Sequence, residues 1–339
     1  MRQFGLSFSE YLIRQNLLHM IVHVTNHCNF RCDHCFIDFS KDRDLKLDTY
    51  KALARDAGRL FWIDIGGGEP FLRKDLSDIV AAFDTRVVTI PSNGSLPDQM
   101  EAQLARMHET STAELVLSLS IDGLEKTHGR IRHQPENWNQ VWETFERLNR
   151  FDWLTIKINT VLTTENEGEI LDLMKEVRSR NPDFHSIILL RGDPADPETK
   201  LPPMSRLREL GPDIYAILET YDYGRSKAAS HILRNYQRYQ WNVSLKTIEE
   251  QRQVVPCIAG KGHMVVMGDG TVSSCEMLPG VGNVNDHSLS EIRRSPAFLE
   301  QRRSIANKEC HCTHNCAMLH SIFFNPASFP HFVRTNIER

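Results

Sequence analysis

The alternation of expected strands and helices constrains this 339-residue chain most. β-rich segments occupy residues 19–25, 60–65, 86–90, 114–121, 154–162 and 186–190, and segments with helical spacing of apolar residues occupy 47–59, 72–83, 98–107, 137–149 and 167–180. Strands that alternate with helices form a parallel sheet with the helices packed outside it. Six such units predict an α/β fold, a partial (β/α)6 barrel of the TIM type, with its chemistry at the carboxyl ends of the strands.

The pattern changes after Arg191. A proline-rich connector, GDPADPETKLPP, leads into a mostly helical stretch from Met204 to Arg252. Two short β-prone runs, 264–267 and 271–274, then flank Gly-Asp-Gly, which is a strong hairpin signal. We therefore expect an N-terminal extension (1–18), a barrel core (19–192), a helical connector (193–256) and a small C-terminal domain (257–339).

The composition is that of an ordinary soluble protein. The chain has 40 Lys and Arg against 44 Asp and Glu, a net charge of −4, and 40% hydrophobic residues. This balance excludes a disordered chain and a globally basic nucleic-acid binder. No apolar run reaches the ~20 residues of a membrane span, and the first residues lack the features of a signal peptide. We expect a cytoplasmic protein with neither a membrane nor a nucleic acid as partner.

Eight cysteines fall into two sets separated by a long gap. The N-terminal set is Cys28, Cys32 and Cys35, and the C-terminal set is Cys257, Cys275, Cys310, Cys312 and Cys316. The cytoplasm keeps thiols reduced, so these cysteines indicate metal binding or catalysis before disulfides. Because scattered core cysteines would not leave such a gap, the pattern favours metal ligands at both ends.

The N-terminal set forms a CxxxCxxC motif on the loop that leaves the first strand. Three thiolates on one tight loop can each bind one iron of a 4Fe–4S cluster, which leaves the fourth iron open to another ligand. A zinc site is the alternative, with His27 or His34 as the fourth ligand.

The end of the second strand carries Gly66-Gly67-Gly68-Glu69-Pro70. With this GGEP motif after CxxxCxxC, the sequence closely resembles the radical S-adenosylmethionine (SAM) superfamily over about residues 19–192. The resemblance implies that SAM binds the open iron through the amino and carboxylate groups of its methionine part. It also implies that Gly67, Gly68 and Glu69 contact that part, and that His34 lies near the adenine.

Later strand ends extend the resemblance. It implies cofactor-binding roles for Ser92 and Asn93 after the third strand, for Ser118, Ser120 and Asp122 at the fourth, and for Asn159 on the fifth. Taken singly, each of these matches also fits an ordinary turn or helix start. The segment HGRIR (128–132) resembles a family HDxxR segment, but Gly129 replaces the acid and leaves the roles of Arg130 and Arg132 open.

The C-terminal cysteines narrow the class. Cys257, Gly270 and Cys275 fit a Cx12Gx4C pattern, and CxCxxxC follows at 310–316. This partly resembles the SPASM and twitch domains of radical SAM enzymes and implies one auxiliary 4Fe–4S cluster in a shortened domain. Five thiols suffice for one four-ligand cluster with one left over. Which two of the last three cysteines bind the cluster stays open, as does a zinc knuckle that uses His311 or His314.

The resemblance implies an enzyme that reductively cleaves SAM to a 5′-deoxyadenosyl radical, which abstracts a hydrogen atom from the substrate. We expect oxidative modification of a ribosomally made peptide or protein, with a ferredoxin or flavodoxin as reductant. Since the barrel begins within about 20 residues, leader recognition would need a separate protein. The alternatives are a small-molecule dehydrogenase or epimerase acting on an aminosugar or cofactor precursor, and a non-catalytic, zinc-stabilised binding protein.

Overall fold

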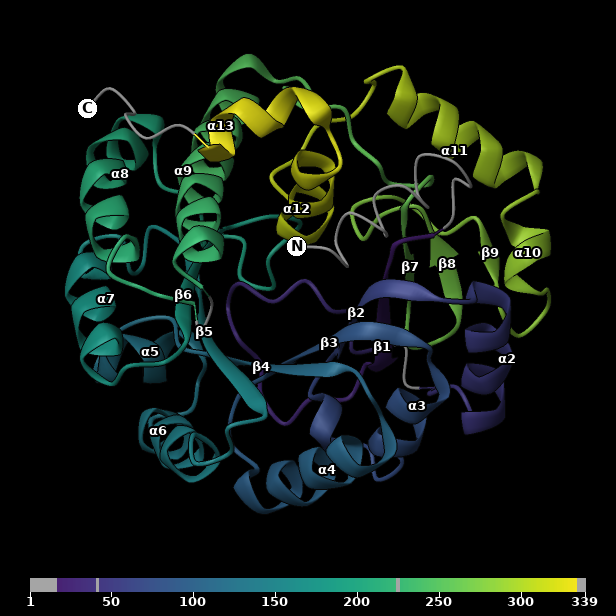
Figure 1. The fold of residues 1–339 in the computed structure, drawn as a ribbon, viewed down its shortest axis with the longest axis horizontal. Helices are drawn as coiled ribbons and strands as arrows, with labels where there is room; N and C mark the ends of the chain where they lie inside the picture. Colours follow the sequence, from purple (N-terminus) through teal and green to yellow (C-terminus); the bar gives the residue numbers. More distant parts are fainter. Residues whose placement is uncertain (1–16, 41–42, 224–225, 334–339) are drawn as a thin grey trace.

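A single curved sheet organises the molecule, with its strands in the order β6-β5-β4-β3-β2-β1-β7-β8-β9. The computed structural model describes residues 17–40, 43–223 and 226–333. In Figure 1 strands β1 to β6 form an arc, with helices α2 to α8 around its outer side. Strands β1 to β6 pair in parallel throughout, which confirms the predicted partial barrel.

Most observed strands and helices begin and end within a few residues of the expected positions. The strands are β1 (His19–Thr25), β2 (Leu60–Gly67), β3 (Thr85–Ser92), β4 (Glu114–Ser120), β5 (Leu154–Leu162), β6 (Phe184–Leu189), β7 (His263–Val266), β8 (Thr271–Ser273) and β9 (Gly282–Asn283). The helices are α2 (Leu47–Ala57), α3 (Leu76–Ala82), α4 (Pro97–Thr110), α5 (Glu125–Ile131), α6 (Asn137–Leu148), α7 (Ile170–Ser179), α8 (Met204–Leu218), α9 (Lys227–Glu250), α10 (Leu289–Ile292), α11 (Pro296–Ala306), α12 (Asn315–Phe323) and α13 (Phe329–Val333).

The two faces of the barrel strands differ in character. On β4, Leu115, Leu117 and Leu119 belong to the main hydrophobic core between the sheet and its helices. Side chains alternate along a strand, so Ser118 and Ser120 face the barrel interior. The interior therefore carries polar groups, while the outer face holds the barrel together.

The predicted helix at 72–83 begins later than expected, at Leu76. A short 3-10 helix, Pro70–Leu72, comes first, and the side chain of Glu69 accepts a hydrogen bond from Phe71 N at its start. A proline tolerates the first position of such a turn because its missing N–H has no partner there. The delay keeps Glu69 at the strand end.

The C-terminal hairpin joins the barrel sheet. Strand β7 pairs in parallel with β1, from His19 opposite His263 to Val22 opposite Val266. Strand β8 then pairs antiparallel with β7, and β9 with β8. The sequence predicts the hairpin but not this pairing, because parallel neighbours far apart in the chain carry no local signal. The predicted domain boundaries stay predictions.

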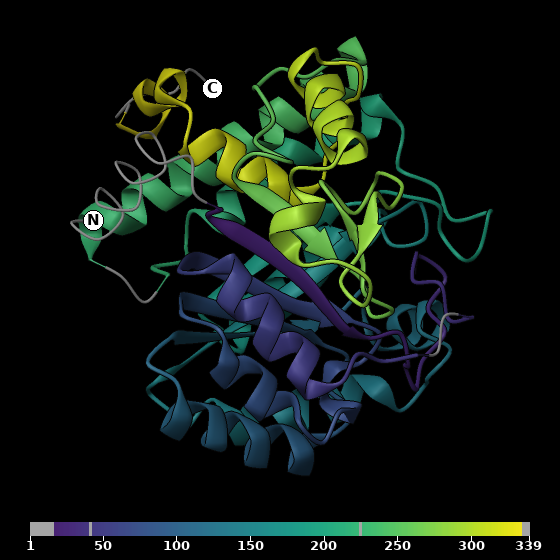
Figure 2. The same ribbon diagram turned by 90° about the vertical axis from the view of Figure 1, so that its right-hand side faces the viewer.

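Two helices of the second half lie between the ends of the arc. Helices α9 and α12 occupy the opening between β6 and β7 in Figure 1, and the view in Figure 2 places α12 over β1. They pack together partly through Gln240 Nε2, which donates to Asn315 Oδ1 at 2.6 Å. The expected extension 1–18 falls almost wholly outside the described residues. Among the helices that the structure describes, none is long and apolar enough to cross a membrane.

Candidate cofactor and active site

The CxxxCxxC loop follows the end of β1. Cys35 N donates to Cys32 O at 3.1 Å, and Phe30 N donates to Cys28 Sγ at 3.4 Å. Burial raises the pKa of Cys28 and of Cys35, and raises that of Cys32 to about 12. The charges of Cys28 and Cys35 both oppose ionisation of Cys32, so the three thiols lie close together. Metal binding replaces such protons, and the three sulfurs fit a cluster.

The glycines of the GGEP motif let β2 pack tightly under this loop. A Cβ on Gly67 would lie 2.1 Å from Thr25 O, and one on Gly68 would lie 2.0 Å from His27 O. Gly68 N donates to Thr25 O at 2.8 Å, and Glu69 N donates to His27 O at 2.9 Å. These glycines thus position the cysteine loop against β2. Their predicted contact with the methionine part of SAM stays a prediction.

Glu69 is the buried acid of the site, 1% exposed. Its carboxylate accepts hydrogen bonds from Asn93 N at 2.8 Å, Ser92 Oγ at 3.0 Å and Phe71 N at 3.2 Å. Burial raises the pKa of Glu69 to about 7 despite these donors. Through these hydrogen bonds the carboxylate connects the end of β2 to the end of β3, beside the cysteine loop.

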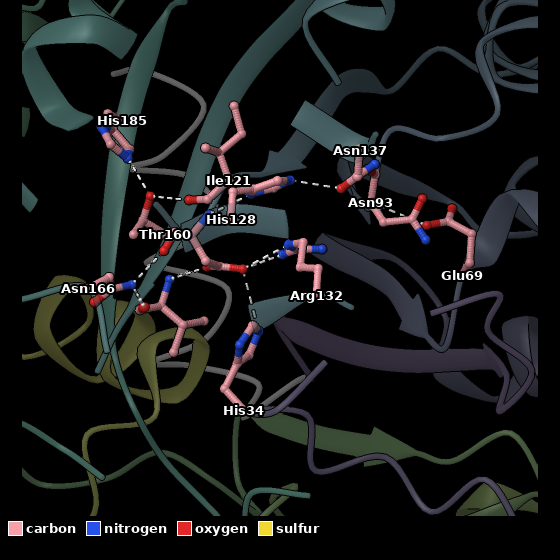
Figure 3. A network of polar contacts seen from close by, with 12 residues as sticks. His34, Glu69, Asn93, Ile121, His128, Arg132, Asn137, Thr160, Asn166 and His185 are labelled. Carbon is pink, nitrogen blue, oxygen red and sulfur yellow. Dashed lines mark hydrogen bonds and ion pairs between the residues drawn. The ribbon is translucent and has the colours of Figure 1, made fainter. Parts of the chain in front are cut away.

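Asp122, just after β4, forms the centre of a buried polar network, whose partners Arg132 and His34 are labelled in Figure 3. Arg132 donates to its Oδ2 from Nε at 2.9 Å and from Nη2 at 2.6 Å, and Val161 N donates to its Oδ1 at 2.8 Å. His34 Nε2 lies 3.7 Å from the same Oδ2. The Arg132 guanidinium also favours the thiolate form of Cys32, so this cation neutralises charge beside the cysteine loop.

A second chain of contacts joins Asp122 to Asn93 (Figure 3). Asp122 N donates to His128 Nδ1 at 3.1 Å, His128 Nε2 lies 2.9 Å from Asn137 Oδ1, and Asn137 Nδ2 donates to Asn93 O at 2.9 Å. Burial lowers the pKa of His128 to about 4, so it is neutral near pH 7. Sequence reasoning missed Asn137. The segment HGRIR (128–132) was the sequence signal that could have identified His128 and Arg132 as site residues, but the sequence analysis left its role open.

Several predicted cofactor-binding residues keep polar atoms without a protein partner. Ser118 Oγ, Asn159 Oδ1 and His34 Nδ1 are buried and make no hydrogen bond in the described structure. Buried polar atoms are nearly always paired, so such a group indicates a ligand or ordered solvent. Ser120 ends β4 and is partly buried. The site therefore fits SAM, although the individual SAM contacts remain predictions.

In the C-terminal domain, four of the five cysteines gather in one place. Cys257 and Cys310 pack against a small cluster that contains buried Cys275. Cys257 N donates to Gln253 Oε1 at 3.2 Å, and Gln253 Nε2 donates to Cys310 O at 3.0 Å. Burial is the main cause that raises the pKa of Cys257 to about 11. The charge of Cys312 adds to this increase, so Cys312 lies near Cys257. Burial also raises the pKa of Cys275, and the charges of Cys312 and Cys257 add to this increase. Four thiols in one cluster fit one 4Fe–4S group.

Cys316 is the fifth cysteine of this set. It sits in the first turn of α12, and the carboxylate of Asp64 on β2 acts on its thiol. Burial is the main cause that raises the pKa of Cys316 well above its usual value, and Asp64 and Glu276 add to it. Cys316 is one of three candidates for two ligand positions, and which two of Cys310, Cys312 and Cys316 bind the cluster stays a prediction.

His311 and His314, the candidate ligands of a zinc site, differ in their burial. His311 Nε2 lies 2.9 Å from Gln251 Oε1 at the surface. His314 is buried and contacts the Glu276 carboxylate through Nε2, while its Nδ1 lies 4.0 Å from Cys275 Sγ. His263, Cys275 and His314 could together hold a metal ion, since one ligand atom of each lies within 4.8 Å of the others.

The geometry defines a class: an α/β partial barrel with metal-binding cysteines at the strand ends and in an appended domain. Residues 22–177 match the model of the radical SAM superfamily, and residues 257–317 match that of the SPASM iron–sulfur cluster-binding domain. Residues 22–177 therefore belong to the radical SAM superfamily, and residues 257–317 form a SPASM domain. The cofactors of this chain are SAM, the 4Fe–4S cluster that binds SAM, and an auxiliary cluster in the SPASM domain.

Individual relatives differ in how much of the chain they share. An S-adenosylmethionine-dependent nucleotide dehydratase of Selenomonas ruminantium is 31% identical over 170 residues, which are 45% of this chain and 59% of the relative. The subtilosin biosynthesis protein AlbA of Bacillus subtilis is 20% identical over 303 residues, which are 82% of this chain and 60% of AlbA. The match thus covers less than two thirds of each relative.

Solved structures share the fold. The structure of anSMEcpe with bound AdoMet and the Cp18Cys peptide superimposes with a TM-score of 0.62 at 15% identity, covering 93% of this chain and 98% of that one. The agreement extends over the barrel and the C-terminal domain together, so the two chains share one fold over nearly their whole length.

Proposed function

We propose that this protein is a radical SAM enzyme that abstracts a hydrogen atom from a residue of a ribosomally made peptide or protein. When bound, the cluster and SAM supply one-electron chemistry that removes hydrogen from an unactivated carbon. Cys28, Cys32 and Cys35 would hold that cluster, while Glu69, Asn93 and Asn159 would position SAM. Cys257, Cys275, Cys310 and Cys312 would hold the auxiliary cluster.

The observation that carries the peptide proposal is the extent of the similarity. The structural neighbour with a bound peptide matches 93% of this chain, and the bacteriocin biosynthesis protein matches 82% of it. The nucleotide dehydratase matches only 45%. That match supports a small-molecule substrate as the second candidate. A ferredoxin or flavodoxin as reductant and a separate leader-binding protein remain parts of this proposal.

The experiment uses the full chain, purified and reconstituted without oxygen, with SAM and dithionite. We expect 5′-deoxyadenosine from the wild type and none from Cys28→Ala, because that variant lacks one ligand of the SAM-binding cluster. Short peptides encoded beside the gene are then added, and their masses and stereochemistry are compared before and after. A colourless protein that contains only zinc would contradict the proposal that this protein is an enzyme. Deoxyadenosine formed only with small-molecule substrates would contradict the proposal that its substrate is a peptide.

A further inference from the structure

Two fully buried histidines lie close to the buried thiol of Cys275. His263 begins β7, the strand that pairs with β1 at the edge of the barrel (Figure 1), and His314 stands at the start of α12. Cys275 follows shortly after the end of β8. One ligand atom of each residue lies within 4.8 Å of the ligand atoms of the other two. Three separate segments thus bring two imidazole rings and one thiol together.

The contacts of His314 place its lone pair on the nitrogen nearer to Cys275. His314 Nε2 contacts the carboxylate of Glu276. A carboxylate only accepts hydrogen bonds, so Nε2 carries the hydrogen, and the neutral ring then has its lone pair on Nδ1. This Nδ1 atom lies 4.0 Å from Cys275 Sγ. A carboxylate bonded to the far nitrogen is the usual support of a metal-binding histidine.

A longer chain of hydrogen bonds places the lone pair of His263 in the same way. His19 Nε2 lies 3.0 Å from Asp64 Oδ2, and His19 Nδ1 lies 2.7 Å from His263 Nδ1. Because the carboxylate accepts from Nε2 of a neutral His19, His19 Nδ1 accepts in turn from His263 Nδ1. The lone pair of His263 is therefore on Nε2, and a carboxylate again stands behind the ring.

His263 Nε2 is the atom that indicates a bound ligand. The ring is fully buried, and Nε2 makes no hydrogen bond with any residue that the structure describes. Buried polar atoms nearly always have a partner. A second hydrogen on this ring would not help, because it would leave a buried charge and an unpaired N–H donor. A metal ion would satisfy the lone pair directly.

The three ligand atoms suit zinc in type and in spacing. Zinc binds imidazole nitrogen at about 2.0–2.1 Å and thiolate sulfur at about 2.3 Å in tetrahedral sites, which places neighbouring ligand atoms about 3.3–3.6 Å apart. The separations here, 4.8 Å at most, reach these values after a small inward movement of the side chains. Magnesium and calcium prefer oxygen ligands. Three protein ligands also leave a fourth position for water or a substrate group.

We propose that His263 Nε2, His314 Nδ1 and Cys275 Sγ bind a zinc ion beside the auxiliary cluster. This zinc site goes beyond the proposed function, in which Cys275 binds only that cluster. A thiolate sulfur has several lone pairs, so Cys275 can bind a cluster iron and the zinc ion together.

The charges around the site suit a divalent cation. Asp64 and Glu276 place one carboxylate behind each histidine and oppose the positive charge of the ion. Glu276 is itself held in place, because its Oε1 lies 2.7 Å from His23 Nε2 and its Oε2 lies 3.8 Å from Arg191 Nη2. The second-shell contacts of both histidines are therefore formed by the fold itself, and such contacts strengthen metal binding about 10- to 100-fold.

The first test measures zinc in the iron-loaded protein. The full chain is reconstituted with iron and sulfide without oxygen, incubated with zinc chloride, freed of unbound metal and analysed for both metals. We expect about one zinc ion per chain with unchanged iron content in the wild type, and at least tenfold weaker zinc binding in His263→Gln and in His314→Gln. The matched control is His311→Gln, because His311 belongs to the same cysteine segment but contacts Gln251 at the surface.

Two outcomes of this test would overturn the zinc site. Loss of iron as zinc binds would show that zinc replaces the auxiliary cluster and does not lie beside it. Zinc binding by the two ligand variants as strong as that of His311→Gln would show that neither ring is a ligand. The proposed function is tested separately by the iron content and by 5′-deoxyadenosine formation, and both are expected to persist if the zinc site fails.

The second test identifies the ligands in the wild type and needs no variant. X-ray absorption at the zinc edge detects zinc and not iron, so the zinc-loaded holoprotein can be measured directly. We expect two imidazole nitrogens at about 2.0–2.1 Å and one sulfur at about 2.3 Å from zinc. A zinc shell without imidazole, or one without sulfur, would overturn the proposal. This spectrum decides the matter by itself if a histidine variant does not fold.

Discussion

Arg132 places both Nε and Nη2 on one oxygen of Asp122, Oδ2, at 2.9 and 2.6 Å, and both side chains are buried. The other oxygen of Asp122 accepts from Val161 N at 2.8 Å. This pair therefore joins the end of α5 to the ends of β4 and β5. It also places a buried cation near the thiols of the cysteine loop.

Removal of Arg132 should destabilise the protein strongly. Breaking a buried ion pair leaves an uncompensated charge and costs about 3–5 kcal/mol. We expect Arg132→Met to lower the free energy of unfolding by this amount in urea denaturation. The matched control is Arg130→Met, because Arg130 pairs with Glu165 at the surface and such pairs contribute about 0–1 kcal/mol. Similar losses in both variants would contradict the structural role of the Asp122 pair.

Glu69 should make the stability of the cofactor-free protein depend on pH. The pKa of its carboxyl is raised from 4.5 to about 7 by burial, so between these values the folded protein holds a proton that the unfolded chain has lost. Stability therefore falls as pH rises from 4.5 to 7, by about 3 kcal/mol from this group. Glu69→Gln should lack that part of the decrease when urea midpoints are compared across the range. Parallel curves for the two proteins would refute it.

Gly68→Ala should disturb the SAM-binding cluster selectively. A Cβ at this position would lie 2.0 Å from His27 O and 3.0 Å from Cys28 N, which are backbone atoms that cannot turn aside. The cysteine loop would have to move, and we expect the reconstituted variant to lose about four irons per chain while the auxiliary cluster remains. Gly168→Ala is the control, since nothing lies within 4 Å of a Cβ there. Full iron content in Gly68→Ala would show that the loop tolerates the shift.

Most of the barrel could be predicted from the sequence because its strands and helices have local patterns. The strands at 19–25 and 154–162 were predicted with the bounds that the structure shows. Helix α5 was not predicted as a helix; it has seven residues, and a segment that short has little periodicity to detect. The parallel pairing of β7 with β1 was also missed, because it depends on tertiary packing alone.

The site was predictable where residues follow one another in a motif. The cysteine loop and GGEP lie together because a strand end precedes each. The role of Arg132 was left open, since Gly129 replaces the acid of the related segment and only the fold shows that Asp122 is its partner. The sequence also could not distinguish Cys312 from Cys316. The two cysteines are four residues apart, and this spacing does not reveal which thiol lies near Asp64 in the fold.

Two asparagines near Asp122 should separate cofactor binding from stability. Asn159 has a buried Oδ1 without a partner, whereas Asn166 donates to Asp122 O and Val161 O, both at 2.8 Å. We expect Asn159→Ala to weaken SAM binding about 5- to 100-fold, which corresponds to about 1–3 kcal/mol for a lost buried partner, with little change in unfolding. Asn166→Ala should lower the free energy of unfolding by a similar amount. Equilibrium dialysis with SAM and urea denaturation measure the two effects, and a SAM affinity unchanged in Asn159→Ala would remove this residue from the cofactor site.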